Sequence, residues 1–175
     1  MRIEETIISN LFQNDEFTRK VTPFIKGAYF AERSERIIFE EFEKLLHKEL
    51  NSSIQPVTVN SCTSAIDLAL HLIGVDPGDE IISTPQTCFA SQVGAINRRA
   101  KIRWADINPK TGCIDPESVK KLITNKTKAI IAVNWAGKLC DYSKLKQFNI
   151  PIIEDAAHCW DVFNDSEIKR GDYIC

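Results

Sequence analysis

Residues 129–155 read AIIAVNWAGKLCDYSKLKQFNIPIIED, and they decide the fold class of the chain. Two short apolar runs, 129–133 and 150–154, have the length and composition of buried strands. Between them, residues 141–148 carry apolar side chains at helical spacing. A strand, a helix and a second strand in so short a segment predict two parallel strands joined by a right-handed crossover.

The same alternation continues toward the N-terminus. It predicts strands at 56–59, 80–83 and 101–105 and helices at 65–73, 91–98 and 116–123. The helix at 65–73 is apolar nearly all round and is expected to be buried. The last helix has its N-cap at Asp115 and a proline at its first position. The predicted fold is therefore a three-layer α/β/α structure with a mostly parallel sheet covered on both faces.

The two ends of the chain differ in pattern. Residues 1–33 are polar and weakly patterned, and we expect an N-terminal arm with one short helix near 4–11. An amphipathic helix is predicted from Ser34 to about Lys48. Residues 172–175 resemble the start of a further strand, so residues 34–175 are expected to form an incomplete domain, and the chain is expected to be half of a longer protein.

Composition excludes several classes of function. The chain has 175 residues, with 22 Lys+Arg against 24 Asp+Glu and a net charge of −2, and this balance argues against nucleic-acid or membrane-surface binding. No apolar run approaches the ~20 residues of a membrane-spanning helix. The six cysteines include no Cys-x-x-Cys pair, no signal peptide is read, and no metal site is expected. A cytoplasmic protein with reduced thiols is therefore expected.

Small and polar residues follow the first predicted strand, at 60–64. Unpaired N–H groups at a helix N-terminus favour an anion, phosphate above all, and the hydroxyls of Thr63 and Ser64 would add donors. An ordinary N-cap is the alternative interpretation. Because no Gly-x-Gly-x-x-Gly or Gly-Lys-Thr motif is present, a nicotinamide-dependent dehydrogenase or an ATP-type phosphate loop is disfavoured.

Two acids end the strand at 150–154, since Asp155 follows Glu154 directly. A buried carboxylate needs a cation or a hydrogen-bond donor, and a protonated heterocycle of a ligand would serve. A helix-capping role for Asp155 is equally compatible with this stretch. His158 could face the same ligand or be structural. Cys88, in the polar bend 83–91, is interpreted as a small pocket-lining residue because no nearby sequence feature would activate it.

These stretches, in their order and spacing, resemble the DegT/DnrJ/EryC1/StrS family of sugar aminotransferases, which are pyridoxal-phosphate enzymes of the aspartate-aminotransferase fold (fold type I). The resemblance covers about residues 30–175. It is carried by residues 60–65 (NSCTSA), 77–82 (PGDEII), 85–91 (PQTCFAS), 106–116 (DINPKTGCIDP), 127–131 (TKAII) and, above all, 153–158 (IEDAAH).

The resemblance implies roles for these residues around pyridoxal 5'-phosphate. Thr63 and Ser64 fall where the family binds the cofactor phosphate, and Asp155 falls on the carboxylate that pairs with the pyridinium nitrogen. His158 falls where the family reaches the phenolic oxygen side of the ring. Cys88 falls where an aromatic side chain usually stacks on the ring. Cys62 replaces a glycine, so its turn must accept a Cβ atom.

The resemblance also implies that the catalytic lysine, which forms the Schiff base with the cofactor, lies beyond Cys175. The whole enzyme is expected to transfer an amino group to a nucleotide-linked keto-sugar, with glutamate as the expected donor, and to work as a homodimer. A sugar dehydratase of the same family and a non-catalytic split or truncated α/β module remain alternatives. The 175-residue chain alone is expected to be inactive.

Overall fold

The computed structural model describes residues 61–159 and 170–175, together with single positions at 33, 37, 38, 40, 41, 44, 45, 48, 57 and 59. The chain divides into two compact units, Met1–Ser61 and Cys62–Cys175. In the described part of the chain, no helix combines the length and the apolar character needed to cross a membrane.

In the first unit, every described residue between 33 and 48 is helical, as the amphipathic pattern predicts. The apolar side chains of Ile37, Ile38 and Leu45 are 39–52% exposed. The short helix expected near 4–11 lies outside the described residues. The strand expected at 56–59 is wrong at its two described positions, Val57 and Val59, which belong to no strand. Val57 is 71% exposed, so it does not occupy the buried strand position that its apolar side chain suggested.

The second unit is built on a parallel sheet, as predicted. Its strands are β1 (Glu80–Ser83), β2 (Lys101–Trp104), β3 (Thr127–Val133), β4 (Ile152–Asp155) and β5 (Tyr173–Ile174), in the order β2-β1-β3-β4-β5. Each neighbouring pair is parallel. The short β5 confirms that residues 172–175 contain a strand, and it pairs with β4 at one edge of the sheet.

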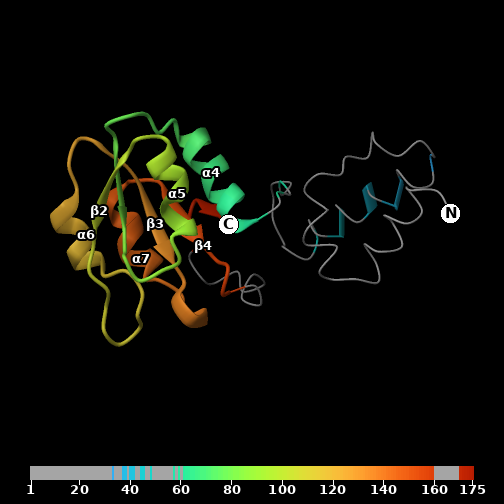
Figure 1. The fold of residues 1–175 in the computed structure, drawn as a ribbon. Coiled ribbons are helices and arrows are strands. Elements are labelled where there is room, and N and C mark those ends of the chain that lie inside the picture. The colour runs from blue at the N-terminus through green and yellow to red at the C-terminus, as the bar shows by residue number, and fades with distance from the viewer. Residues whose placement is uncertain are drawn as a thin grey trace. The chain divides into compact units, whose positions relative to one another are not determined.

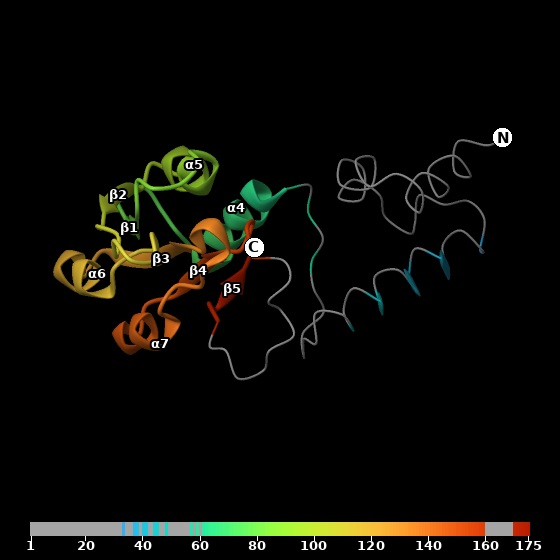
Figure 2. The same cartoon turned by 90° about the horizontal axis from the view of Figure 1, so that it is seen from below.

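Helices cover both faces of this sheet. They are α4 (Cys62–Ile73), α5 (Ala90–Asn97), α6 (Pro116–Leu122) and α7 (Tyr142–Leu145), with short 3-10 turns η3 (Trp135–Gly137) and η4 (Lys146–Phe148). Figures 1 and 2 show α4 and α5 on one side of the strands and α6 and α7 on the other. The predicted three-layer α/β/α architecture is confirmed.

The core consists of two clusters because side chains alternate between the faces of each strand. Ile82, Ile130 and Ile152 pack with α6 and α7. Their neighbours Ile81, Ile131 and Ile153 pack with α4 and α5. This double burial explains why the strands read as continuous apolar runs.

Helix α4 is buried on one face only, contrary to the sequence-based expectation. Ile66, Ala69 and Leu70 are at most 3% exposed, whereas Leu72 is 64% exposed. The reason is that α4 packs against α5 and the sheet, so its remaining face is left without cover in the described part of the chain. Because apolar residues occur all round this helix, the sequence does not show which face is buried and which is exposed.

Candidate functional site

The carboxyl ends of β3 and β4 and the N-terminal ends of α4 and α5 surround one cavity. Parallel α/β sheets bind ligands at this edge. The cavity encloses about 100 Å³ and is lined by Cys62, Thr63, Ile66, Thr87, Cys88, Ala90, Ser91, Val133, Asp155, Ala157 and His158. Ligand pockets usually measure ~300–1,000 Å³, so these residues form one wall of a site and do not enclose a whole ligand.

Asp155 is the acidic residue of this wall. Its side chain is 6% exposed. Oδ2 accepts a hydrogen bond from the Ser91 hydroxyl at 2.7 Å, and Oδ1 accepts from the Ala157 amide at 3.2 Å and from the Cys62 thiol at 3.3 Å. The expected donors for a buried carboxylate are therefore present. The bond to Ala157 belongs to a local turn, since residues 157 and 158 are not helical.

Cys62 begins α4, and its thiol donates a hydrogen bond to Asp155 at the end of β4. Its backbone is not among the described residues with positive φ, so the turn accepts the Cβ atom without strain. Burial and the neighbouring Asp155 carboxylate raise the pKa of the Cys62 thiol. The thiol therefore stays protonated at neutral pH and acts as a hydrogen-bond donor.

We predict that iodoacetamide modifies Cys88 in the folded chain roughly tenfold or more faster than Cys62, because the thiolate is the attacking form. Cys88 is exposed, whereas Cys62 is half-buried with a raised pKa. Burial and the carboxylates of Asp155 and Glu154 similarly raise the pKa of Cys175 to about 12. Peptide mapping by mass spectrometry at pH 8 measures the rates, and the denatured chain is the control. Equal rates for Cys62 and Cys88 in the folded chain would contradict the assigned hydrogen bond.

The N-terminus of α4 supplies the second part of the wall. Thr63 lines the cavity, and the first turn of this twelve-residue helix contains no acidic side chain. Its positive end is therefore available to an anion. Ser64 is half-buried in the same turn but does not line the cavity. The structure thus brings Thr63 together with Asp155, Cys88 and His158, and it leaves Ser64 beside the cavity wall.

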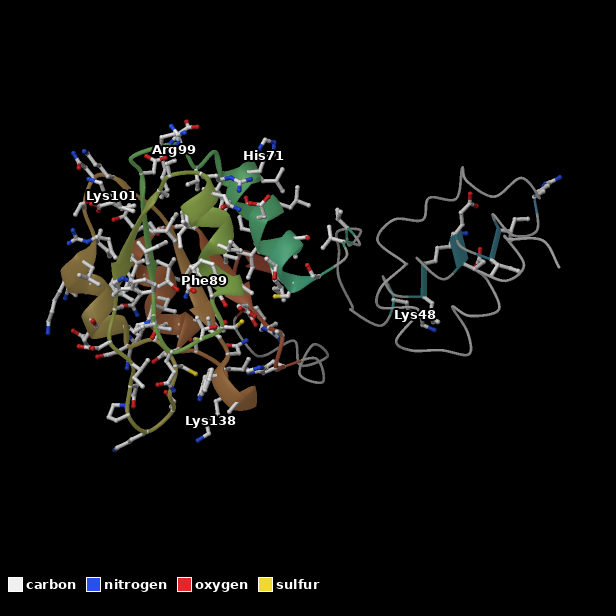
Figure 3. All side chains as sticks on the ribbon, in the orientation of Figure 1. Lys48, His71, Phe89, Arg99, Lys101 and Lys138 are labelled. Carbon is white, nitrogen blue, oxygen red and sulfur yellow. The ribbon has the colours of Figure 1, made fainter. Side chains whose placement is uncertain are left out.

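His158 and Cys88 lie at the rim, and both are exposed. The Trp135 ring meets the His158 ring edge-on, with centroids 5.9 Å apart. This contact places Trp135 near the mouth of the cavity. Next to Cys88, Phe89 lies at the N-terminal end of α5 with a side chain 65% exposed (Figure 3). Phe89 was not predicted as a site residue from the sequence, because its exposure beside the cavity is visible only in the structure.

Glu154 takes no part in the cavity, because successive side chains of β4 point to opposite faces of the sheet. It is fully buried and accepts hydrogen bonds from Asn134 Nδ2 at 2.7 Å, Arg170 Nε at 2.8 Å and the Gly171 amide at 2.8 Å. Asn134 Oδ1 in turn accepts from the Tyr142 hydroxyl at 2.8 Å. Glu154 is thus a structural residue whose partner, Arg170, the sequence analysis did not foresee.

Comparisons with known proteins agree with this fold. Residues 13–163 match the DegT/DnrJ/EryC1/StrS aminotransferase family. The chain is 38% identical over 106 residues to the spore coat polysaccharide biosynthesis protein SpsC of Bacillus subtilis, covering 58% of this chain and 27% of that protein. It is 34% identical over 121 residues to the 3-oxo-glucose-6-phosphate:glutamate aminotransferase of the same organism, covering 67% and 27%.

A solved structure of Bacillus subtilis NtdA with bound cofactor PMP superimposes with a TM-score of 0.63 at 25% identity, covering all of this chain and 35% of that one. The fold is thus the one shared by pyridoxal-phosphate-dependent sugar aminotransferases. The chain belongs to the DegT/DnrJ/EryC1/StrS aminotransferase family. It spans about a third or less of the lengths of these three relatives.

Proposed function

We propose that the second unit is the cofactor-binding part of a pyridoxal-phosphate-dependent aminotransferase whose whole form aminates a keto-sugar. The observation that carries this proposal is that Asp155 and Thr63 line the same cavity. These residues lie 92 positions apart in the sequence. Asp155 lies at the carboxyl end of β4 and suits the protonated ring nitrogen of the cofactor. Thr63 lies at the N-terminal end of α4 and suits the phosphate.

Asp155 fits the cofactor because its carboxylate is buried without a paired cation. Within residues 61–159 and 170–175, its hydrogen-bond partners are a hydroxyl, a thiol and a backbone amide. A buried carboxylate is stabilised further by a positive group that reaches it from a ligand. The protonated ring nitrogen of pyridoxal 5'-phosphate is such a group.

The other residues of the wall would bind and orient the cofactor. Thr63, with Ser64 in the same helical turn, would bind the phosphate through the N-terminus of α4. His158 would contact the phenolic oxygen side, and Cys88 would line the ring with the neighbouring Phe89 supplying an aromatic surface. When bound, the cofactor supplies an electron sink for amino transfer.

For the substrates, we propose glutamate as the amino donor and a nucleotide-linked keto-sugar as the acceptor. A relative named as a glutamate aminotransferase acting on a sugar phosphate supports the donor and the sugar class. A relative named for polysaccharide biosynthesis supports a role in that process. Aminotransferase names among the matched relatives favour amino transfer over the dehydratase alternative. We further propose a homodimer in the cytoplasm, with residues 34–175 forming the large-domain part and 1–33 an arm.

A binding titration tests the proposal directly. We expect the chain to bind pyridoxamine 5'-phosphate (PMP), which needs no lysine, with a dissociation constant in the micromolar range, and to bind NADH at least a hundredfold more weakly. Quenching of tryptophan fluorescence, with Trp135 next to His158, is one readout. The same chain with pyridoxal 5'-phosphate and glutamate is expected to show no turnover. A folded chain that binds NADH and not PMP would refute the proposal.

A further inference from the structure

The hydroxyl groups of Ser91 and Thr87 are linked in sequence to the Asp155 carboxylate by hydrogen bonds. The Ser91 hydroxyl lies 2.7 Å from Asp155 Oδ2, and the Thr87 hydroxyl lies 2.8 Å from the Ser91 hydroxyl. Ser91 is 2% exposed and comes from the first turn of α5, whereas Thr87 belongs to the bend that precedes this helix. The three side chains therefore form one continuous chain of hydrogen bonds along the cavity wall.

The direction of this chain follows from the number of protons. An ionised carboxylate only accepts hydrogen bonds, and a serine hydroxyl has a single proton to donate. Ser91 must therefore donate to Asp155. Thr87 must then donate to Ser91, although the distance between the two hydroxyls alone allows either direction. Hydrogen bonds arranged head to tail polarise one another, so the Thr87 hydroxyl strengthens the bond from Ser91.

The two oxygens of the carboxylate are used differently. Oδ1 accepts from both the Ala157 amide and the Cys62 thiol. Oδ2 accepts only from Ser91 among the described residues. Because each carboxylate oxygen has two lone pairs, Oδ2 is the oxygen with acceptor capacity left for a ligand.

We propose that Thr87 and Ser91 are positioning residues that hold Asp155 with Oδ2 presented to the ring nitrogen of the cofactor. This inference rests on the proposed function. It adds that Oδ2 is the carboxylate oxygen that contacts the ring nitrogen, and that Thr87 and Ser91 orient it. A fixed carboxylate binds a cation more tightly than a rotating one, because less orientational freedom is lost on binding. Ser91 and Thr87 then affect the ring nitrogen only through Asp155.

The test compares two ligands that differ only at the ring nitrogen. PMP carries this nitrogen, and the 1-deaza analogue of PMP carries carbon in its place. We expect Ser91→Ala to weaken PMP binding roughly tenfold, in line with hydrogen bonds to charged groups, and deaza-PMP binding less than twofold. Thr87→Val should weaken PMP binding roughly threefold, and it should again weaken deaza-PMP binding less than PMP binding. Equal losses for both ligands would mean that Ser91 acts only on the structure of the wall, and would overturn the inference.

Two variants serve as controls. Ser91→Thr keeps the hydroxyl and should retain most of the PMP affinity. Cys62→Ala removes the weak thiol donor to the other oxygen, Oδ1, and should reduce PMP affinity less than Ser91→Ala does. A larger loss in Cys62→Ala would assign the main orienting role to Oδ1 and overturn the inference.

A second measurement needs no cofactor. In a double-mutant cycle of unfolding with Ser91→Ala and Asp155→Ala, we expect the Ser91 replacement to change the unfolding equilibrium roughly tenfold when Asp155 is present, and much less in the variant with alanine at position 155, which has no group to accept the hydrogen bond. Additive effects would overturn the inference whatever the cofactor does. Coupled effects in a folded chain that binds no PMP would refute the proposed function and, with it, the positioning role, while leaving the hydrogen bond between Ser91 and Asp155 established.

Discussion

Replacing Asp155 with asparagine is expected to weaken PMP binding at least a hundredfold. The side chain keeps its shape but loses the charge that would pair with the protonated ring nitrogen. Removing one member of a buried charge pair costs about 3–5 kcal/mol, and about 3 kcal/mol corresponds to a hundredfold change in affinity. Fluorescence titration at neutral pH measures the change, and circular dichroism checks that the variant remains folded.

The matched control for this experiment is Asp106→Asn. Asp106 follows β2, is exposed and does not line the cavity, so its loss of charge should change PMP affinity less than twofold. This control separates a local effect of Asp155 from a general effect of net charge on an anionic ligand. If the two variants bind PMP equally well, Asp155 is not the partner of the ring nitrogen.

Replacing Arg170 with alanine is expected to lower the free energy of unfolding by about 3–5 kcal/mol, because it leaves the Glu154 carboxylate buried without its cation. Arg170 contacts both oxygens of Glu154 through Nε, and the two side chains are 13% and 0% exposed. Such a loss is a large share of the ~5–15 kcal/mol that stabilises a typical domain. Urea denaturation measures it.

Two further variants sharpen this test. Lys146→Ala removes the cation of an exposed pair with Asp172, whose side chains are 40% and 44% exposed, and should cost less than ~0.5 kcal/mol. Adding Glu154→Gln to Arg170→Ala should recover part of the loss, since the uncompensated charge is then gone. An Arg170→Ala variant no less stable than Lys146→Ala would show that the buried pair does not stabilise the sheet.

Most of the second unit could be predicted from residue patterns because its strands are buried on both faces. The run 129–133 lies within β3, and the predicted strand at 80–83 coincides with β1. The proline after Asp115 marks the start of α6, where Asp115 accepts the capping hydrogen bond from the Glu117 amide. These signals are local, so a single sequence contains them.

What could not be predicted depends on contacts between distant residues. The pairing of Glu154 with Arg170 joins a strand to a segment sixteen residues later, and no local pattern indicates it. From the sequence, Ser91 was one of several polar residues in the bend 83–91. Its hydrogen bond to Asp155 is visible only in the structure. The exposure of Leu72 depends on which neighbours α4 has, and the composition of the helix does not specify them.

The connections of Asp155 also have a consequence for the order in which the protein matures. Its partners in α4 and α5 precede it by 93 and 64 residues, so both helices leave the ribosome well before β4 does. Closing loops of this length is slow compared with forming a helix. A growing chain that ends within α7 already contains the N-terminal ends of α4 and α5, but it does not yet contain Asp155. A ligand that pairs with Asp155 can therefore be bound only after β4 has been synthesised.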